Sequence, residues 1–208
     1  MKIEVTGQVG PTLISDGVSS QPFRQGKTGE QIISELQGRY YENTVRGNVF
    51  MAHAIVTAPV IYSTAAGTGG PLLWNPTPNK NAVILGVTCG ITVVTTVAAA
   101  LGLTGNTGQT SAPTSTTAID SSGCLYVSAA KPDMNVYRIG TPVNAGNFFL
   151  PFAQLHTGAL TTDTFGLGFV DIGGLIVVPP NAWCSIAASA TATTTIAQLG
   201  LIWAEVPV

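Results

Sequence analysis

Hydrophobic and polar residues alternate with a period of two along much of the chain. Between residues 83 and 94, the odd positions are bulky and apolar, and the even positions are mostly small or polar. Successive side chains of a β-strand point to opposite faces, whereas the apolar face of a helix repeats every three to four residues. The alternation therefore predicts a strand with one buried face.

The same pattern recurs from Asn48 to the end of the chain, interrupted by clusters of Gly, Pro, Asn and Ser. Loops connect these segments and no second amphipathic helix follows them, which disfavours parallel βαβ units. The spacing predicts an all-β fold, an antiparallel β-sandwich of the jelly-roll-like kind. About eight strands are expected, at residues 49–58, 82–94, 97–103, 125–129, 135–139, 148–155, 175–178 continued by 183–187, and 196–205.

Two connections stand out. Pro179-Pro180-Asn181 predicts a rigid turn, because proline fixes φ and lacks the amide hydrogen that a strand would donate. Residues 105–122 are rich in Ser, Thr and Gly, and this low-complexity stretch predicts an exposed, mobile loop.

The beginning of the chain differs from the rest. Residues 1–50 hold 10 of the 18 charged side chains, which places a boundary near Gly47. Val9 to Gln25 has little periodicity and predicts an extended arm. We therefore expect an N-terminal arm at residues 1–47 and a sandwich domain at 48–208.

One short helix is expected within this arm, at about residues 28–38. Thr28 and Gln31 form a capping-box pattern at its start, and Gly38 is suited to its end. Ile33, Leu36 and Tyr40 fall on one helical stripe.

Charge is scarce. Lys and Arg total 8 against 10 Asp and Glu, so the chain offers no basic field for nucleic acid. Only 9% of residues are charged, against about a quarter in typical soluble domains. A surface with so few charges gives little electrostatic repulsion between molecules, and we expect partner proteins to cover it.

The cysteines indicate a reducing compartment. Cys89, Cys124 and Cys184 are odd in number and widely spaced, which suits buried free thiols better than disulfides or zinc ligands. Residues 1–9 lack the apolar core of a signal peptide. Assembly in a reducing cytoplasm fits both observations.

A membrane span is the main structural rival for residues 82–103, where 15 of 22 residues are apolar. The stretch is rich in β-branched residues and interrupted by glycines, and it alternates as a strand does. Lys80 alone is also a poor flanking anchor. We expect strands here and no membrane partner.

Residue patterns for catalysis or cofactor binding are lacking. His53 and His156 lie in apolar strand contexts without a neighbouring carboxylate, and we interpret them as structural. Asp120, Asp133 and Asp171, like Asp163, are isolated and form no calcium-loop pattern. The expectation is a non-enzymatic protein with no cofactor and no metal.

Three stretches carry a resemblance to known proteins. Residues 38–50, from Gly38-Arg39-Tyr40-Tyr41 to Val49-Phe50, and residues 177–207 resemble predicted structural proteins of tailed bacteriophages. Leu73-Trp74-Asn75-Pro76, followed by residues 80–85, is similar to jelly-roll modules of phage head-decoration and fibre proteins. The resemblance implies a virion subunit on the capsid surface, often a homotrimer, that clamps the major capsid protein or other virion proteins.

The arm provides the expected docking residues, because Arg and Tyr concentrate binding energy at interfaces. They are Phe23, Arg24, Lys27, Arg39, Tyr40, Tyr41 and Arg46. The alternative is that Tyr40, Tyr41 and Phe50 cover one end of the sandwich while the arginines are solvated.

The leading functional hypothesis is a capsid decoration or cement protein that stabilises the phage head by protein contacts. A second is a tail fibre, spike or coat subunit whose loop 105–122 touches a receptor. A third is a carbohydrate-binding sandwich, in which exposed Trp74, Trp183 or Trp203 would stack on sugar rings.

Overall fold

The computed structural model describes residues 7–8, 23–24, 40–57, 59, 61–62, 70–93, 99–119, 121–124, 131–155, 165–190 and 196–208. The chain forms two compact units, residues 1–41 and 42–208. In the first, β1 (Gly7–Gln8) pairs in parallel with β2 (Phe23–Arg24). The helix predicted at 28–38 and the strand predicted at 125–129 lie outside the described residues, and the boundary at residue 47 stays a prediction.

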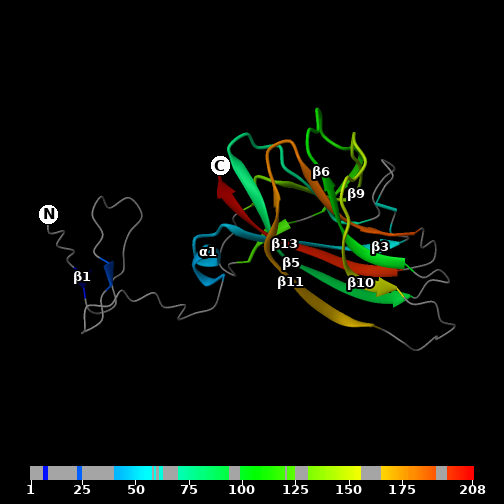
Figure 1. Cartoon of the computed structure of the whole chain (residues 1–208), viewed down its shortest axis with the longest axis horizontal. Helices are drawn as coiled ribbons and strands as arrows, with labels where there is room; N and C mark the ends of the chain where they lie inside the picture. Colours follow the sequence, from blue (N-terminus) through cyan, green and yellow to red (C-terminus); the bar gives the residue numbers. More distant parts are fainter. Residues whose placement is uncertain are drawn as a thin grey trace. The chain divides into compact units, whose positions relative to one another are not determined.

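The second unit contains two antiparallel sheets (Figure 1). Neighbours in the five-stranded sheet are, in order, β11 (Phe165–Val178), β5 (Lys80–Val93), β13 (Ile196–Pro207), β3 (Val49–Thr57) and β8 (Ser121–Gly123). The order in the six-stranded sheet is β10 (Leu150–Leu155), β6 (Ala99–Asn106), β12 (Trp183–Ala188), β4 (Leu72–Trp74), β9 (Asn135–Thr141) and β7 (Thr114–Ala118). The short helix α1 (Tyr41–Val45) precedes β3.

Strand pairing follows one rule for eight of these strands. The first of them pairs with the last, β3 with β13, and the next pairs are β4 with β12, β5 with β11 and β6 with β10. This is a long antiparallel hairpin rolled into two sheets, which is the jelly-roll topology. The predicted all-β, antiparallel, jelly-roll-like sandwich is therefore confirmed. Strands β7, β8 and β9 are inserted between β6 and β10 and extend the sheets at their edges.

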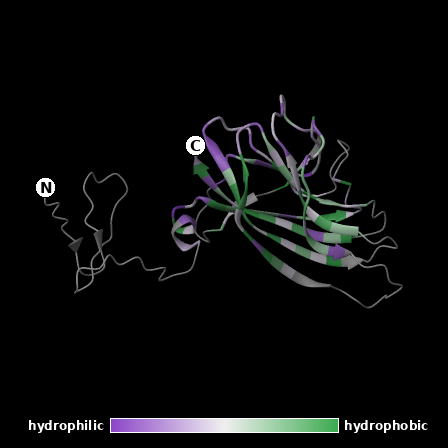
Figure 2. Cartoon of the chain, viewed as in Figure 1, coloured by the Kyte–Doolittle hydropathy of each residue, from purple (hydrophilic) through white to green (hydrophobic). Residues whose placement is uncertain are grey.

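The core lies between the sheets and follows the predicted alternation. In β3, the even positions from Phe50 to Val56 are buried and the odd positions from Met51 to Thr57 are exposed. Phe50 packs against the fully buried Trp203 of β13, with ring centroids 6.0 Å apart. In Figure 2 the strands are mostly green and pale, while purple residues gather in the loops and around α1.

The strand predicted at residues 175–178 and continued by 183–187 was wrong in its connectivity. The segments 175–178 and 183–187 are not one interrupted strand, because β11 belongs to the five-stranded sheet and β12 to the six-stranded sheet. The turn between them was predicted correctly: the Ala182 amide donates to the Pro179 carbonyl at 3.1 Å, and Asn181 has a φ of 57°. It reverses the chain from one layer to the other. β11 also starts at Phe165, ten residues earlier than expected.

The prediction of a mobile loop at 105–122 was also wrong. The segment includes the end of β6, all of β7 and the start of β8. Gln109 is buried, and its backbone amide donates to the Asn181 carbonyl at 2.8 Å. Its side-chain oxygen accepts from the backbone amide of Val143 at 3.0 Å. Threonines in β7 pair with β9, because β-branched residues favour strands even where the alternation is weak.

Candidate functional site

Most of the exposed large apolar side chains in the strands of the second unit lie on the outward side of the five-stranded sheet. In the middle of this sheet Met51 lies opposite Ile202, Ile55 opposite Gln198, and Phe169 opposite Thr88, and beyond the register shifts in β11 and β5 Val177 lies opposite Val83. Residues of the same parity therefore share a face. We call the outward residues of β3, β13, β5 and β11 the outer sheet face; its large apolar members are Met51, Ile55, Ile202, Phe169, Leu175 and Val177.

These side chains are unusually exposed for their size. Leu175 is 75% exposed, Phe169 57% and Ile55 52%. Single exposed apolar residues are ordinary, but a contiguous group on one face marks an interaction surface. The outer sheet face therefore has the composition of an interface.

Charge is almost absent from it. The four strands contain only three charged residues, of which Lys80 and Glu205 pair with each other. The third, Asp171, is exposed on β11 opposite Gly86. His53 is exposed in the middle of β3, so its predicted structural role in an apolar environment does not fit its position.

Glycines occupy the centre of the same face. Gly200 of β13 lies opposite Thr88 of β5, and a side chain there would meet the Thr88 hydroxyl at 2.4 Å. At Gly86, an added Cβ would lie 2.4 Å from the Phe169 ring, so that ring lies over the glycine. Glycines and Thr88 thus lie between Ile202 and Gln198 on the two central strands, while most of the exposed large apolar side chains lie on the flanking strands β3 and β11.

The outward side of the six-stranded sheet is different, because the chain itself covers part of it. Tyr62 and Phe149 stack with ring centroids 4.8 Å apart. A Cβ on Gly102 of β6 would lie 2.7 Å from the Phe149 ring, and one on Gly146 would lie 2.0 Å from the Thr104 hydroxyl. Loop residues therefore pack directly on β6, which leaves the two sheets with unlike outer faces.

The predicted docking residues are only partly described. Phe23 and Arg24 form β2, without a description of their side chains, and Lys27 and Arg39 lie outside the described residues. The other three lie at α1, where Tyr40 is partly buried and Tyr41 and Arg46 are exposed. Their docking role stays a prediction.

The most extensive polar cluster ties β13 to the entry of β5 and β9. Glu205 is 4% exposed, accepts the Met134 amide at 3.1 Å and lies 3.4 Å from Lys80 Nζ. The hydrogen bond to the exposed Asp133, together with the charge of Glu205, raises the pKa of Lys80 despite partial burial. Asn75 donates to the carbonyls of Lys80 and Val178 at 2.8 and 3.0 Å. Each of these polar groups bonds to another group of the protein. We call Glu205, Lys80, Asp133 and Asn75 the polar clamp, because their bonds hold neighbouring strands together.

The thiols occupy apolar sites. Cys89 and Cys184 are buried and free, as predicted, whereas Cys124 is half-buried. Burial raises the pKa of Cys89 to about 11 and that of Cys184 to about 12. A nucleophilic thiol needs the opposite shift. Within the described ranges, no three His, Cys, Asp or Glu residues gather as a metal site would require.

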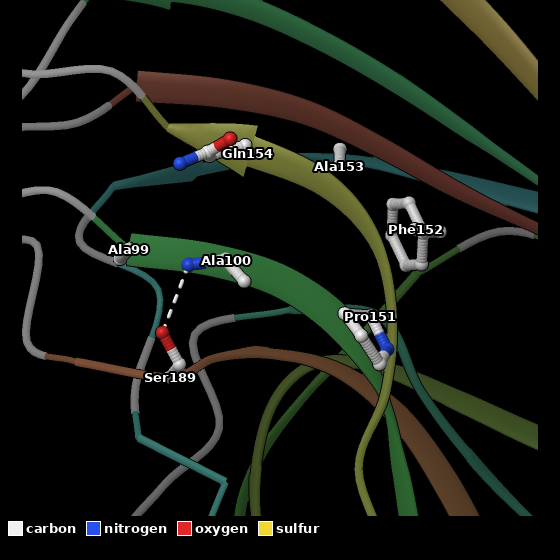
Figure 3. A pocket seen from close by; sticks show the side chains of 7 residues that line it. All are labelled: Ala99, Ala100, Pro151, Phe152, Ala153, Gln154 and Ser189. Carbon is white, nitrogen blue, oxygen red and sulfur yellow. Dashed lines mark hydrogen bonds between the residues drawn. The ribbon is translucent and has the colours of Figure 1, made fainter.

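An open pocket of about 500 Å³ lies at the edge strand β10 (Figure 3). Ala99 and Ala100 of β6 form one wall and the residues from Pro151 to Gln154 of β10 another, and the Ser189 hydroxyl accepts the Ala100 amide at 2.8 Å. The lining contains no ionisable side chain. It therefore offers neither an acid, a base nor a charge for a substrate.

Two of the three tryptophans are buried in the sandwich. Trp183 and Trp203 are 2% and 0% exposed, and Trp74 is partly buried. A stacking platform needs an exposed ring face. The expectation of an exposed tryptophan in the carbohydrate-binding hypothesis was therefore wrong for Trp183 and Trp203.

Sequence reasoning missed the outer sheet face, although one signal was present. Residues 175–178 form a continuous apolar run, which means that both sides of the strand are apolar. The run was interpreted as half of a short core strand.

Comparison with known proteins assigns no family: no family model matches the chain, and no curated protein and no solved structure matches it significantly. In the part of the chain that the structure describes, no helix has the length and hydropathy of a membrane span.

Proposed function

We propose that this chain is a non-enzymatic structural subunit of a virion, of the capsid decoration or cement type. The observation that carries the proposal is the outer sheet face, where Phe169, Leu175 and Val177 of β11 and Met51 and Ile55 of β3 are exposed on the two sides of β5 and β13. An apolar surface of this kind favours a neighbouring protein over water, since burying it gains about 25 cal/mol per Å².

The low charge of the whole chain supports the same function. A freely diffusing domain needs charged groups to stay apart from its neighbours, and only 9% of these residues are charged. A subunit held in a shell does not have this requirement, because its apolar surface is covered after assembly.

The mechanism is adhesive. A subunit that touches two or more capsid subunits gains affinity from linked contacts and opposes expansion or rupture of the shell. The outer sheet face would supply apolar contact area towards a neighbouring subunit, and the arm, with its Arg and Tyr residues, would supply the attachment to the capsid. The resemblance to phage head-decoration and fibre proteins is the reason for placing this assembly in a virion.

The test is the location and copy number of the chain in purified particles. Virions from a culture that produces the protein would be banded in a density gradient, quantified by mass spectrometry and labelled with gold-conjugated antibody. We expect many copies per particle with label over the head. Label confined to the tail would favour a fibre or spike subunit, and absence from the particle would contradict the proposal.

A further inference from the structure

The outer faces of the two sheets differ in how far the chain itself covers them. Loop residues pack on the six-stranded sheet over β6, as the Tyr62 and Phe149 rings show. On the five-stranded sheet, the large side chains of β3 and β11 remain exposed, with Leu175 the most exposed at 75%. Something of matching chemistry must cover this second face in an assembly.

We propose that two copies of this chain pack their outer sheet faces against each other about a two-fold axis. The inference deepens the proposed function and rests on it, because it identifies the first neighbour of the subunit as a second copy. The contact is a sheet-on-sheet packing, the same arrangement that joins the two sheets inside the sandwich.

The scarcity of charge on the face favours a second copy over a charged partner. The four strands contain only three charged residues, Lys80, Glu205 and Asp171, and the first two are paired in the polar clamp. A basic or acidic partner would find almost nothing to pair with and would lose hydration. A second copy brings an equally weakly charged face, on which the apolar side chains and the uncharged polar groups of Gln198 and Thr88 need no ionic partner.

The distribution of large and small residues fits a two-fold contact. Such a contact is isologous: one patch must provide both the projecting groups and the places that receive them. Here Met51 and Ile55 project from β3, whereas the outward positions of Gly200 and Gly86 carry no side chain of their own and are covered by the Thr88 hydroxyl and the Phe169 ring. The same face therefore carries projecting side chains on β3 and a flatter middle on β13 and β5.

The size of the face is sufficient. Four strands about 4.8 Å apart, with β3 contributing nine residues at about 3.3 Å each, span roughly 20 by 30 Å, or about 600 Å² per copy. Two copies would bury about 1,200 Å², the lower end of the range for specific protein pairs.

The experiment is sedimentation of the full chain with two charged variants and one control. Ile55→Lys and Leu175→Lys each place a charge on the outer sheet face at an exposed position. Val143→Lys is the matched control, since Val143 is 47% exposed but lies outside the four strands. Circular dichroism and thermal melting would establish that each variant folds. If Ile55→Lys does not fold, Leu175→Lys alone tests the face.

We expect the unmodified chain and Val143→Lys to sediment as dimers. Both face variants should be monomers at the same concentration, with a dimer Kd raised at least about 30-fold. A monomeric or trimeric unmodified chain would overturn the inference, as would face variants that dimerise like the control.

Particle incorporation separates this inference from the proposed function. If the chain is found on particle heads but is a monomer in solution, the two-fold contact is wrong and the structural role stands. If the face variants lose the dimer while the chain is absent from particles, the contact stands and the proposed function is wrong.

Discussion

Glu205 shows how a buried charge can hold a nearly uncharged sandwich together. It accepts the Met134 amide and lies 3.4 Å from Lys80, while Lys80 also reaches the exposed Asp133. Glu205→Ala should lower the free energy of unfolding by about 2–3 kcal/mol, because it leaves a buried amide without an acceptor. Asp133→Ala removes only an exposed partner of the same lysine and should cost less than about 1 kcal/mol. Urea unfolding measures both, and equal losses would contradict the clamp.

Because of the buried thiols, the free energy of unfolding should depend on pH in the alkaline range. The pKa of Cys184 rises from 9.0 to about 12 on folding, so above pH 9 the unfolded chain holds fewer protons than the folded one. Stability should therefore fall as pH rises from 9 towards 12, by up to about 1.4 kcal/mol per pH unit for this thiol. Cys184→Ala should flatten this decline. Urea unfolding at pH 8 and pH 10.5, with reductant present, tests it, and an unchanged slope would disprove the assignment.

Among the elements, those with strong alternation could be predicted from sequence and the others could not. Residues 49–58 and 196–205 became β3 and β13 almost as predicted, because each has one buried side. β4 was missed because three residues carry no periodicity, and the start of β11 was missed because glycines interrupt it. Pairing between layers is a long-range property that no local pattern contains.

The bulge in β11 provides a test at this scale. The register of β11 with β5 shifts between Asp171 and Ile176, and Gly174 within this interval has a φ of 83°. Gly174→Ala should destabilise the fold by about 1–2 kcal/mol, because residues with a Cβ disfavour that conformation. Gly168→Ala, in the same strand with its nearest neighbour 3.9 Å away, should change stability by less than about 0.5 kcal/mol. Thermal unfolding compares them, and equal shifts would refute the explanation.

For the whole molecule, the general character of the candidate site could be predicted but its location could not. Low charge indicated a partner-covered surface, and the arginines and tyrosines directed attention to the arm. The outer sheet face depends on which strands become neighbours and which side the loops cover. Both follow from the folding of the complete chain, since residues 51 and 169 come to lie on the same face, with two strands between them, only after folding.

The division of the chain into two units predicts separable roles. Removing residues 1–41 should leave the sandwich folded, because the second unit contains both sheets. If the arm docks on the capsid, the shortened protein should lose at least about tenfold in affinity for particles while its melting temperature stays within a few degrees. Co-sedimentation with particles that lack the protein measures this, and undiminished binding would exclude the docking role.

The most direct test of the central claim is an electron cryomicroscopy map of particles that carry the protein. The account predicts repeated jelly-roll density on the head, with the side formed by β3, β13, β5 and β11 covered by protein. Particles without such density, or density in which that side faces solvent, would contradict it.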